Sequence, residues 1–377
     1  MRQYSLLNNW AFNRLAVSLL LLVSFNSASS SAPAQTTATN KQVINKQVTV
    51  ISVAKAQALT EQIAVTAQAL SGHPFSGTVV IEQAGQPLAS WVAGDGINAN
   101  SSYVIASQSK QITAALVLAA VDKQLISLSA PINQYLGTKT SPQPYDEAIT
   151  VHHLLSHTSG VTPTGQDNQF TPGSQFRYSK LGYELLAQIL IKVENKPFEL
   201  QVAEFARQSS LPQLYSDTGS LVEIKQQQAN LAIGRHETGD ELIPSDIHIN
   251  QGLLAAGGLQ ASATTLSQFM HQLHDGQLLS AASYQAMVSP HTARPHRWGN
   301  TRYGYGLQIH QQDQLMEYSH GGYIAGYSSL TLYYPRQQLA VVLLENTSLT
   351  LDDIDRAFAL HDHLREKTRQ LLLDVEK

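Results

Sequence analysis

The stretch SYVIASQSKQITAAL, residues 102–116, places a serine and a lysine three positions apart, directly before a run of apolar residues. Ser107 and Lys110 form an SxxK pair, a spacing that carries acyl transfer in several enzymes. With 36 serines and 12 lysines in 377 residues, about one such pair is expected by chance. A second pair does occur, at Ser52 and Lys55. The spacing alone therefore decides nothing, and the surroundings of each pair matter.

The residues after Ser107 predict a buried helix. The segment from Ile112 to Val121 is apolar on every face except at Thr113, so this helix should run through the interior and present only its end. Free backbone amides at that end favour negative charge, and residues three apart share one face. Lys110 would then lie beside Ser107, with its pKa lowered by burial toward that of a usable base. A helix cap followed by a lysine that reaches solvent explains the same features equally well.

The pair at Ser52 has a simpler interpretation. Apolar residues between Ile51 and Leu70 recur at helical spacing, and Ser52 stands where that helix would begin. Serine is a favoured N-cap residue, because its hydroxyl accepts a hydrogen bond from a free backbone amide. We expect Ser52 to cap the first helix and Lys55 to lie on its solvated face.

Composition excludes several classes of protein. The chain has no cysteine, which excludes a disulfide framework, thiol catalysis and thiolate metal sites. Its formal net charge is −4 and it contains no basic stripe, so no nucleic-acid partner is expected. The sequence also lacks GxSxG, HExxH and GxxxxGK[ST], which leaves SxxK as the nucleophile motif.

The first 34 residues are typical of an export signal. Arg2 and Arg14 precede an apolar stretch, Leu15 to Phe25, and a small-residue region ends at Ala34. We expect cleavage there, a linker over residues 35–49, and a periplasmic or secreted product. The apolar stretch is shorter than the ~20 residues that a spanning helix needs, so no membrane span is expected after cleavage. An uncleaved signal anchor is the alternative.

Strand and helix patterns predict an α+β fold with one domain over residues 50–375. Strands are expected at both ends of the chain: 77–83, 86–92, 303–310, 315–319, 327–334 and 339–345. Helices are expected at 51–70, 112–125, 151–156, 181–193, 264–274 and 351–375. We therefore predict an antiparallel sheet built from both chain ends and flanked by helices, with an all-helical insert. The α/β lobe would comprise 50–106 and 295–375, the helical lobe 107–294, and a site would lie between them.

Six segments in order resemble the serine β-lactamase and penicillin-binding protein superfamily, specifically its class C branch with D-alanyl-D-alanine carboxypeptidases and related esterases. They are YVIASQSKQITAAL (103–116), ITVHHLLSHTSG (149–160), TPGSQFRYSKLGYELLAQIL (171–190), AAGGLQASATTLSQF (255–269), RYGYGLQI (302–309) and YSHGGYIAGYSS (318–329). An ordered set is far more specific than one motif. The resemblance covers roughly residues 50–375 and implies the β-lactamase-like fold.

The resemblance also implies roles for individual residues. Ser107 would be the acylated nucleophile and Lys110 its base, while Tyr178 would match the tyrosine of the family's YxN motif and share proton transfer with the lysine. His320 would match the third box, where it would offer a donor or positive edge to a substrate carboxylate or to the tyrosine. The glycine at position 322 would let the substrate approach closely, and the amides of Ser107 and Tyr323 would form the oxyanion hole. Without the other segments, Tyr178 would be assigned to the core at a turn and His320 to a structural role.

One position departs from the family pattern. Lys180 stands where the YxN motif has an asparagine that binds the catalytic lysine and a substrate carbonyl. Two neighbouring ammonium groups lower each other's pKa, so base function would be kept. A substrate amide would lose its donor and acceptor pair, which puts efficient β-lactam or peptide turnover in doubt.

The remaining histidines raise the question of a metal. His153 with His157, His271 with His274, and His361 with His363 are close in sequence, but none accompanies a carboxylate in a recognised ligand pattern. We expect surface or capping roles for these residues, packing near the cleft for His157, and neither a metal nor another cofactor.

The sequence thus predicts an exported serine hydrolase that opens an amide or ester through an acyl-enzyme. The expected substrate is a β-lactam, a peptidoglycan-derived D-Ala peptide or a carboxylic ester, and a monomer is expected. The alternative is a catalytically weak sensor that binds cell-wall peptides.

Overall fold

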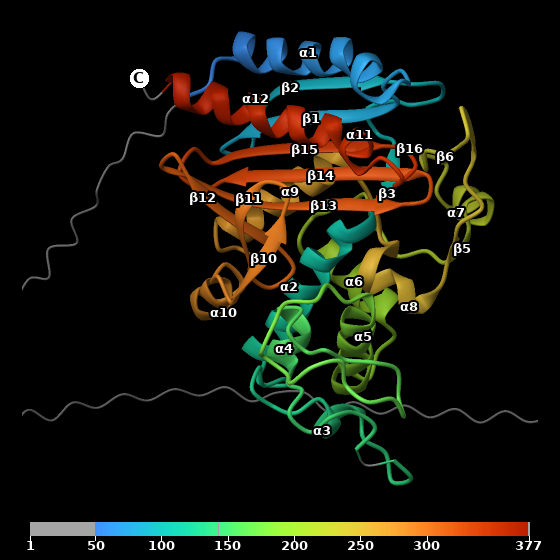
Figure 1. The fold of residues 1–377 in the computed structure, drawn as a ribbon, viewed down its shortest axis with the longest axis vertical. Coiled ribbons are helices and arrows are strands. Elements are labelled where there is room, and N and C mark those ends of the chain that lie inside the picture. The colour runs from blue at the N-terminus through green and yellow to red at the C-terminus, as the bar shows by residue number, and fades with distance from the viewer. Residues whose placement is uncertain (1–49, 142, 376–377) are drawn as a thin grey trace, which may run out of the picture. The chain divides into compact units, whose positions relative to one another are not determined.

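The fold is built around a large antiparallel sheet, whose strands run across Figure 1 one above another. The computed structural model describes residues 50–141 and 143–375, so the predicted signal segment and the predicted linker lie outside the described residues. The strand order is β10-β11-β12-β13-β14-β15-β1-β2, and every neighbouring pair is antiparallel. The strands are β1 (Gly77–Gln83), β2 (Gln86–Ala93), β10 (Thr292–His296), β11 (Gly299–Tyr303), β12 (Gln308–Gln312), β13 (Leu315–Ile324), β14 (Tyr327–Tyr334) and β15 (Leu339–Glu345).

Strands from the two ends of the chain pair inside this sheet, next to its β2 edge. Strand β1 pairs with β15 along its whole length, with Gly77 opposite Glu345 and Gln83 opposite Leu339. The prediction of an antiparallel sheet assembled from both ends is therefore confirmed. The predicted bounds of β14 and β15 agree with the structure residue by residue.

Helices cover both faces of the sheet, which explains why β1 is buried throughout. Helices α1 (Val53–Ser71) and α12 (Ala359–Val375) lie side by side over one face (Figure 1). Val79 and Ile81 point into the core beneath them, and Val80 points into the core on the opposite face. Since successive strand residues face opposite sides, a strand buried on both faces is apolar without alternation.

Ser52 caps α1 as predicted. Its hydroxyl accepts a hydrogen bond from the backbone amide of Lys55 at 3.3 Å, and both residues are exposed. The second SxxK pair therefore has a local structural role at a helix end.

The insert between β2 and β10 is mainly helical. Its longer helices are α2 (Ser109–Asp122), α5 (Lys180–Glu194), α6 (Phe198–Gln208), α7 (Leu221–Gln227), α9 (Ala263–His274) and α10 (Ala281–Met287). Its short elements are β3 (Ser102–Val104), α3 (Asn133–Leu136), α4 (Val151–Leu155), β4 (Leu214–Tyr215), β5 (Gly219–Ser220), β6 (Arg235–Thr238), β7 (Glu241–Pro244), β8 (His248–Ile249), α8 (Gln251–Leu253) and β9 (Gln260–Ser262). The prediction of an all-helical insert needs correction, because β3, β9 and β4 form one small sheet, β5 pairs with β8, and β6 and β7 form a sheet with β16 (Thr347–Ser348).

Two predicted elements are interrupted. The strand expected over 303–310 is broken between β11 and β12, because Gly304 and Leu307 close a turn and Gly306 adopts a φ of +74° against the backbone of Lys110. The helix expected over 351–375 divides into α11 (Ile354–Ala357) and α12. The second group of main-sheet strands begins with β10 at Thr292, whereas the predicted boundary between the helical lobe and the α/β lobe is at residue 295.

No helix within residues 50–141 and 143–375 combines the length and the apolar character needed to cross a bilayer.

Candidate active site

Ser107 lies in a tight turn at the start of the buried helix. The 3₁₀ turn Ala106–Gln108 leads directly into α2, and Ala106 has a φ of +49°. A left-handed conformation costs a non-glycine residue roughly 1–2 kcal/mol, so neighbouring contacts must hold the turn. Ser109 supplies two of them: its hydroxyl donates to the Ala106 carbonyl at 2.8 Å and accepts from the Leu259 amide at 3.1 Å. Ser107 itself stays partly exposed and lines a cavity.

A buried amide network ties this turn to the sheet. Gln108 Nε2 donates to the carbonyl of His320 on β13 at 2.5 Å. Gln108 Oε1 accepts from Gln111 Nε2 at 2.6 Å and from the Thr331 hydroxyl on β14 at 2.9 Å. Because all these groups are buried, breaking one bond would leave an unsatisfied polar group. The serine turn is therefore held rigidly against β13 and β14.

Lys110 is fully buried beside Ser107. Its Nζ lies 3.3 Å from Ser107 Oγ and donates to the carbonyl of Ala256. Burial lowers the pKa of Lys110 below its usual value, attraction to Tyr178 opposes this shift, and the charges of Lys180 and Arg294 lower it further. A buried amine of lowered pKa within hydrogen-bond distance of a hydroxyl can accept its proton.

Tyr178 lies two residues before α5, beside the Lys110 amine. Lys110 Nζ lies 4.8 Å from the centre of the Tyr178 ring. The Tyr178 hydroxyl is buried and has no hydrogen-bond partner among the described residues. The structure thus brings Ser107, Lys110 and Tyr178 together, as the resemblance implies, and the interaction with Tyr178 raises the pKa of Lys110 against the effect of burial.

His157 holds the segment that carries Tyr178. Its Nδ1 accepts a hydrogen bond from the Ser179 amide at 3.1 Å, and its ring lies 4.3 Å from the Tyr178 ring. Burial lowers the pKa of His157 well below its ordinary value, and the charge of Lys110 adds to that shift. A neutral ring that accepts at Nδ1 carries its proton on Nε2. His157 packs against the cleft, as predicted, and also orients the backbone of Ser179.

His320 is arranged differently from the prediction. Its Nδ1 bonds to the Gly321 carbonyl at 2.6 Å, and its Nε2 lies 3.1 Å from the Tyr303 hydroxyl. Burial, followed by the charges of Arg294 and Lys110, lowers the pKa of His320 well below its ordinary value. A positive edge at His320 is therefore excluded at neutral pH, and both ring nitrogens already have partners. The prediction of a donor at His320 is corrected to a neutral ring that supports Tyr303.

Arg294 supplies the charge that His320 lacks. This residue lies on β10 and lines the same cavity, with its Cζ 5.5 Å from the Tyr178 ring centre and 5.6 Å from that of Tyr303. Arg294 is not among the residues predicted from the sequence, because β10 contains Pro295 and has no apolar alternation. The sequence feature that could have indicated Arg294 is the short basic run of Arg294, His296 and Arg297.

The cavity has a volume of about 530 Å³. Its polar lining includes Ser107, Tyr178, Lys180, Arg294, Arg297 and His320, and its apolar lining includes Trp298, Tyr323, Leu351, Ile354 and Phe358. Asp362 fixes the apolar side by accepting from Arg297 Nε at 2.8 Å and from Trp298 Nε1 at 2.5 Å. Lys180 is exposed at the start of α5, so its ammonium reaches the cavity from the solvent side.

Gly322 lets β13 approach the serine turn. A Cβ at this position would lie 2.1 Å from Ser329 Oγ and 2.9 Å from the Ile105 carbonyl, while the Ser329 hydroxyl donates to that carbonyl at 2.9 Å. Tyr323 follows on β13, and its hydroxyl donates to the Leu349 carbonyl at 2.6 Å. The amides of Ser107 and Tyr323 remain the predicted oxyanion donors.

We expect Gly322→Ala to lower both stability and activity, because the new methyl group must displace Ser329 or the Ser107 turn. Overpacking of this kind costs about 1–3 kcal/mol, which urea unfolding would measure. Gly321→Ala is the matched control for stability, since the nearest atom to its Cβ is His361 Nδ1 at 4.0 Å. Equal unfolding free energies for the two variants would contradict this account of Gly322.

The other histidines have mixed roles. The expected capping role is correct for His153, which forms a capping box with Thr150 at the start of α4. Surface or capping roles are wrong for His271 and His361, which are buried, and His361 Nε2 bonds to the Ser328 hydroxyl at 2.9 Å. In the described part of the chain, no group of three or more His, Asp or Glu side chains is placed to hold a metal ion.

Comparison with known proteins decides the family. The Beta-lactamase family model matches residues 64–365, which span every residue of the site described above. The chain belongs to the β-lactamase family. Among curated relatives, it is 23% identical over 295 residues to the putative penicillin-binding protein PbpX of Bacillus subtilis, covering 72% of this chain and 71% of the relative.

Solved structures show the same fold at low identity. The D-amino acid amidase from Ochrobactrum anthropi superposes with a TM-score of 0.67 at 18% identity, over 83% of this chain and 99% of that one. The D-alanine carboxypeptidase AmpC from Burkholderia cenocepacia gives 0.66 at 16% identity, over 81% and 98%. The β-lactamase-like fold predicted from the sequence is thereby confirmed.

Proposed function

We propose that this β-lactamase family member is an exported serine hydrolase that opens an amide or ester through an acyl-enzyme at Ser107. The observation that carries the proposal is the contact between Ser107 Oγ and Lys110 Nζ at 3.3 Å, with Lys110 fully buried and its pKa lowered. Serine is a weak nucleophile without such a base. The cavity in front of Ser107 provides room for a substrate of modest size.

In the proposed reaction, the Ser107 hydroxyl gives its proton to the neutral Lys110 amine as its oxygen attacks the substrate carbonyl. The amides of Ser107 and Tyr323 hold the resulting oxyanion. The bond to the leaving nitrogen or oxygen then breaks, and the leaving group takes a proton through Tyr178, which Lys110 replenishes. Water next attacks the acyl ester and gives one proton to the same groups. They return this proton to the Ser107 oxygen as the ester bond breaks and the carboxylic acid leaves.

The walls of the cavity bear on the substrate class. Trp298, Leu351, Ile354 and Phe358 offer an apolar side, which suits a substrate with an apolar substituent. The neighbouring structures include a D-amino acid amidase and a D-alanine carboxypeptidase, so amide bonds as well as esters belong in the test. Lys180 stands where the family has a neutral amide that binds a substrate carbonyl. The loss of this amide favours ester substrates over amide substrates.

A substrate panel tests the proposal. Nitrocefin, a D-Ala-D-Ala peptide, and p-nitrophenyl acetate and butyrate would be assayed with wild type, Ser107→Ala and Ser52→Ala. We expect turnover of at least one class that is lost in Ser107→Ala and kept in Ser52→Ala. Turnover that survives Ser107→Ala would overturn the proposal. Acylation of Ser107 without turnover of any class would instead support the alternative of a penicillin-binding sensor, which the departure at Lys180 motivates.

We expect Lys180→Asn to raise the ratio of nitrocefin to p-nitrophenyl ester hydrolysis, because it restores a neutral donor and acceptor at the cavity wall. One restored hydrogen bond corresponds to roughly a fivefold to tenfold change in that ratio. The measurement is kcat/KM for both substrates at a pH on the activity plateau. Lys180→Met, which removes the charge without adding an amide, is the matched control, and an equal ratio in both variants would contradict this role of Lys180.

A further inference from the structure

His157 holds the backbone on both sides of Tyr178. Its carbonyl oxygen accepts a hydrogen bond from the Arg177 amide at 2.8 Å, and its Nδ1 accepts one from the Ser179 amide at 3.1 Å. Its ring also lies 4.3 Å from the ring of Tyr178. One residue therefore binds both chain neighbours of Tyr178 and packs against the tyrosine side chain itself.

The backbone of His157 does not explain why a histidine stands at this position. The residue lies two positions after the end of α4 and has a φ of +59°. Glycine, or less often asparagine, is the usual residue in a left-handed conformation after a helix, because a Cβ is disfavoured there. Such a conformation persists in other residues only where the surrounding contacts hold it. A histidine here therefore indicates that the ring has a role of its own.

The ring of His157 is fully buried and accepts its hydrogen bond at Nδ1. Burial lowers the pKa of His157 well below its ordinary value, so the ring is neutral and its proton is on Nε2. Nε2 has no hydrogen-bond partner among the described residues, and an unpaired buried donor costs free energy. The bond to the Ser179 amide and the packing against Tyr178 are what this ring contributes in return.

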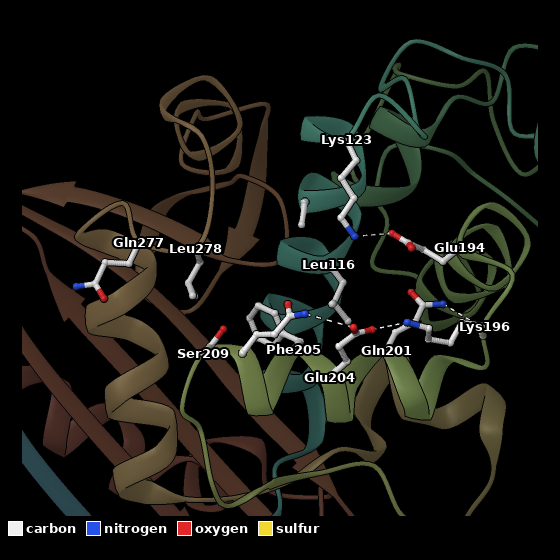
Figure 2. A pocket seen from close by; sticks show the side chains of 12 residues that line it. Leu116, Lys123, Glu194, Lys196, Gln201, Glu204, Phe205, Ser209, Gln277 and Leu278 are labelled. Atoms are coloured by element: carbon white, nitrogen blue, oxygen red, sulfur yellow. Dashed lines mark hydrogen bonds and ion pairs between the residues drawn. The ribbon is translucent and has the colours of Figure 1, made fainter. Parts of the chain in front are cut away.

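Tyr178 stands outside the helix that follows it. Helices α2 and α5 pack against each other, and their far ends are joined by an ion pair between Lys123 and Glu194 at 2.9 Å, beside the cavity drawn in Figure 2. Because α5 begins at Lys180, this packing does not by itself place Tyr178. Its position depends on the contacts of the segment before α5, which is the segment that His157 holds.

We propose that His157 is a positioning residue for proton transfer, which acts by holding the Tyr178 hydroxyl where it reaches both Lys110 and the leaving group of the substrate. In the proposed reaction, Tyr178 gives its proton to the leaving atom and regains one from Lys110. A displacement of about 1 Å in such a group can cost roughly 100-fold in rate. This inference rests on the proposed function and adds a residue that acts through Tyr178.

The test compares two butyrate esters whose leaving groups differ in their need for a proton. The p-nitrophenolate ion leaves without one, whereas phenyl butyrate reacts faster when its leaving oxygen is protonated. His157→Gly keeps the favoured backbone conformation and removes the ring. We expect it to lower the ratio of kcat/KM for phenyl butyrate to that for p-nitrophenyl butyrate by about 10- to 100-fold. His157→Asn should stay within about threefold of the wild-type ratio, because asparagine tolerates this conformation and its Oδ1 can accept from the Ser179 amide.

Two controls separate this role from general damage to the fold. In a Tyr178→Phe background, His157→Gly should cause no further fall in the ratio, because both residues act on the same proton transfer. Lys123→Met breaks the pair at the far ends of α2 and α5, where Lys123 is exposed. This variant should leave the ratio within about threefold of the wild type, since exposed pairs contribute little.

A measurement on the wild type requires no variant to fold. NMR with ¹⁵N-labelled histidine should show His157 protonated at Nε2 and not at Nδ1 between about pH 5 and pH 8. A proton on Nδ1, equal losses for both esters in His157→Gly, additive losses in the double variant, or an equal fall in His157→Asn or Lys123→Met would each overturn the inference. Loss of both ester activities in Ser107→Ala, alongside any of these results, would leave the proposed function standing.

Discussion

Replacing Ser107 by alanine should lower kcat/KM by about 1,000-fold or more on every substrate that the protein turns over. The nucleophile carries the covalent step, and loss of such a residue removes almost all of the catalytic advantage. The expected loss is in kcat rather than KM, because the cavity walls that bind the substrate are unchanged. Steady-state kinetics with the best substrate of the panel would measure it.

Ser52→Ala is the matched control, since Ser52 is the other SxxK serine and caps α1. We expect this variant to lose about 1 kcal/mol of stability, as for a typical N-cap, with kcat/KM unchanged. A fall in activity for Ser52→Ala as large as that for Ser107→Ala would show that the assay reports folding rather than chemistry.

Lys110→Met should reduce kcat by about 100- to 10,000-fold, the usual contribution of a positioned general base. The methionine side chain is of similar length, and none of the groups that shift the pKa of Lys110 is an Asp or Glu, so the fold should survive. Circular dichroism would check that point. Wild-type rates on a stable amide or ester, compared with those of the variant, would give the loss.

The pH dependence of the activity follows from the pKa of Lys110. Lys110 accepts a proton only when neutral, and its pKa is lowered from 10.5, so activity should rise with pH along a limb that lies below the ordinary lysine range. Lys180→Asn removes a charge that helps to lower this pKa, so the limb should move to higher pH. Lys110→Met should lack the limb altogether. A limb at the same pH in Lys110→Met would assign the base to another group.

Local patterns in the sequence predict much of the fold. The hairpin of β1 and β2, the paired strands β14 and β15, and the cap at Ser52 all follow from alternation, turn residues and helix signals that lie within a few positions of one another. The break at Gly304–Leu307 does not, because it depends on how Gly306 packs against Lys110, almost 200 residues earlier. The short strands of the insert escape prediction for a similar reason, since each is only two to four residues long.

The sequence likewise predicts one part of the site and not the rest. The buried helix after Ser107 and the ordered segments indicate which residues gather there, and the structure does bring Ser107, Lys110 and Tyr178 together. The state of His320 could not be predicted, because it depends on a bond to Tyr303 and on the charge of Arg294, which is distant in sequence. Arg294 itself was not predicted, because its place beside the rings of Tyr178 and Tyr303 is known only from the structure.

The most direct test of the central claim is intact-protein and peptide mass spectrometry after brief exposure to nitrocefin and to p-nitrophenyl butyrate. Our account predicts one added acyl group, located on the peptide that contains Ser107, which accumulates in Lys110→Met more slowly than in wild type and is absent in Ser107→Ala. An adduct on another residue, or catalytic turnover with no acyl group passing through Ser107 when the reaction is quenched within one turnover, would contradict it.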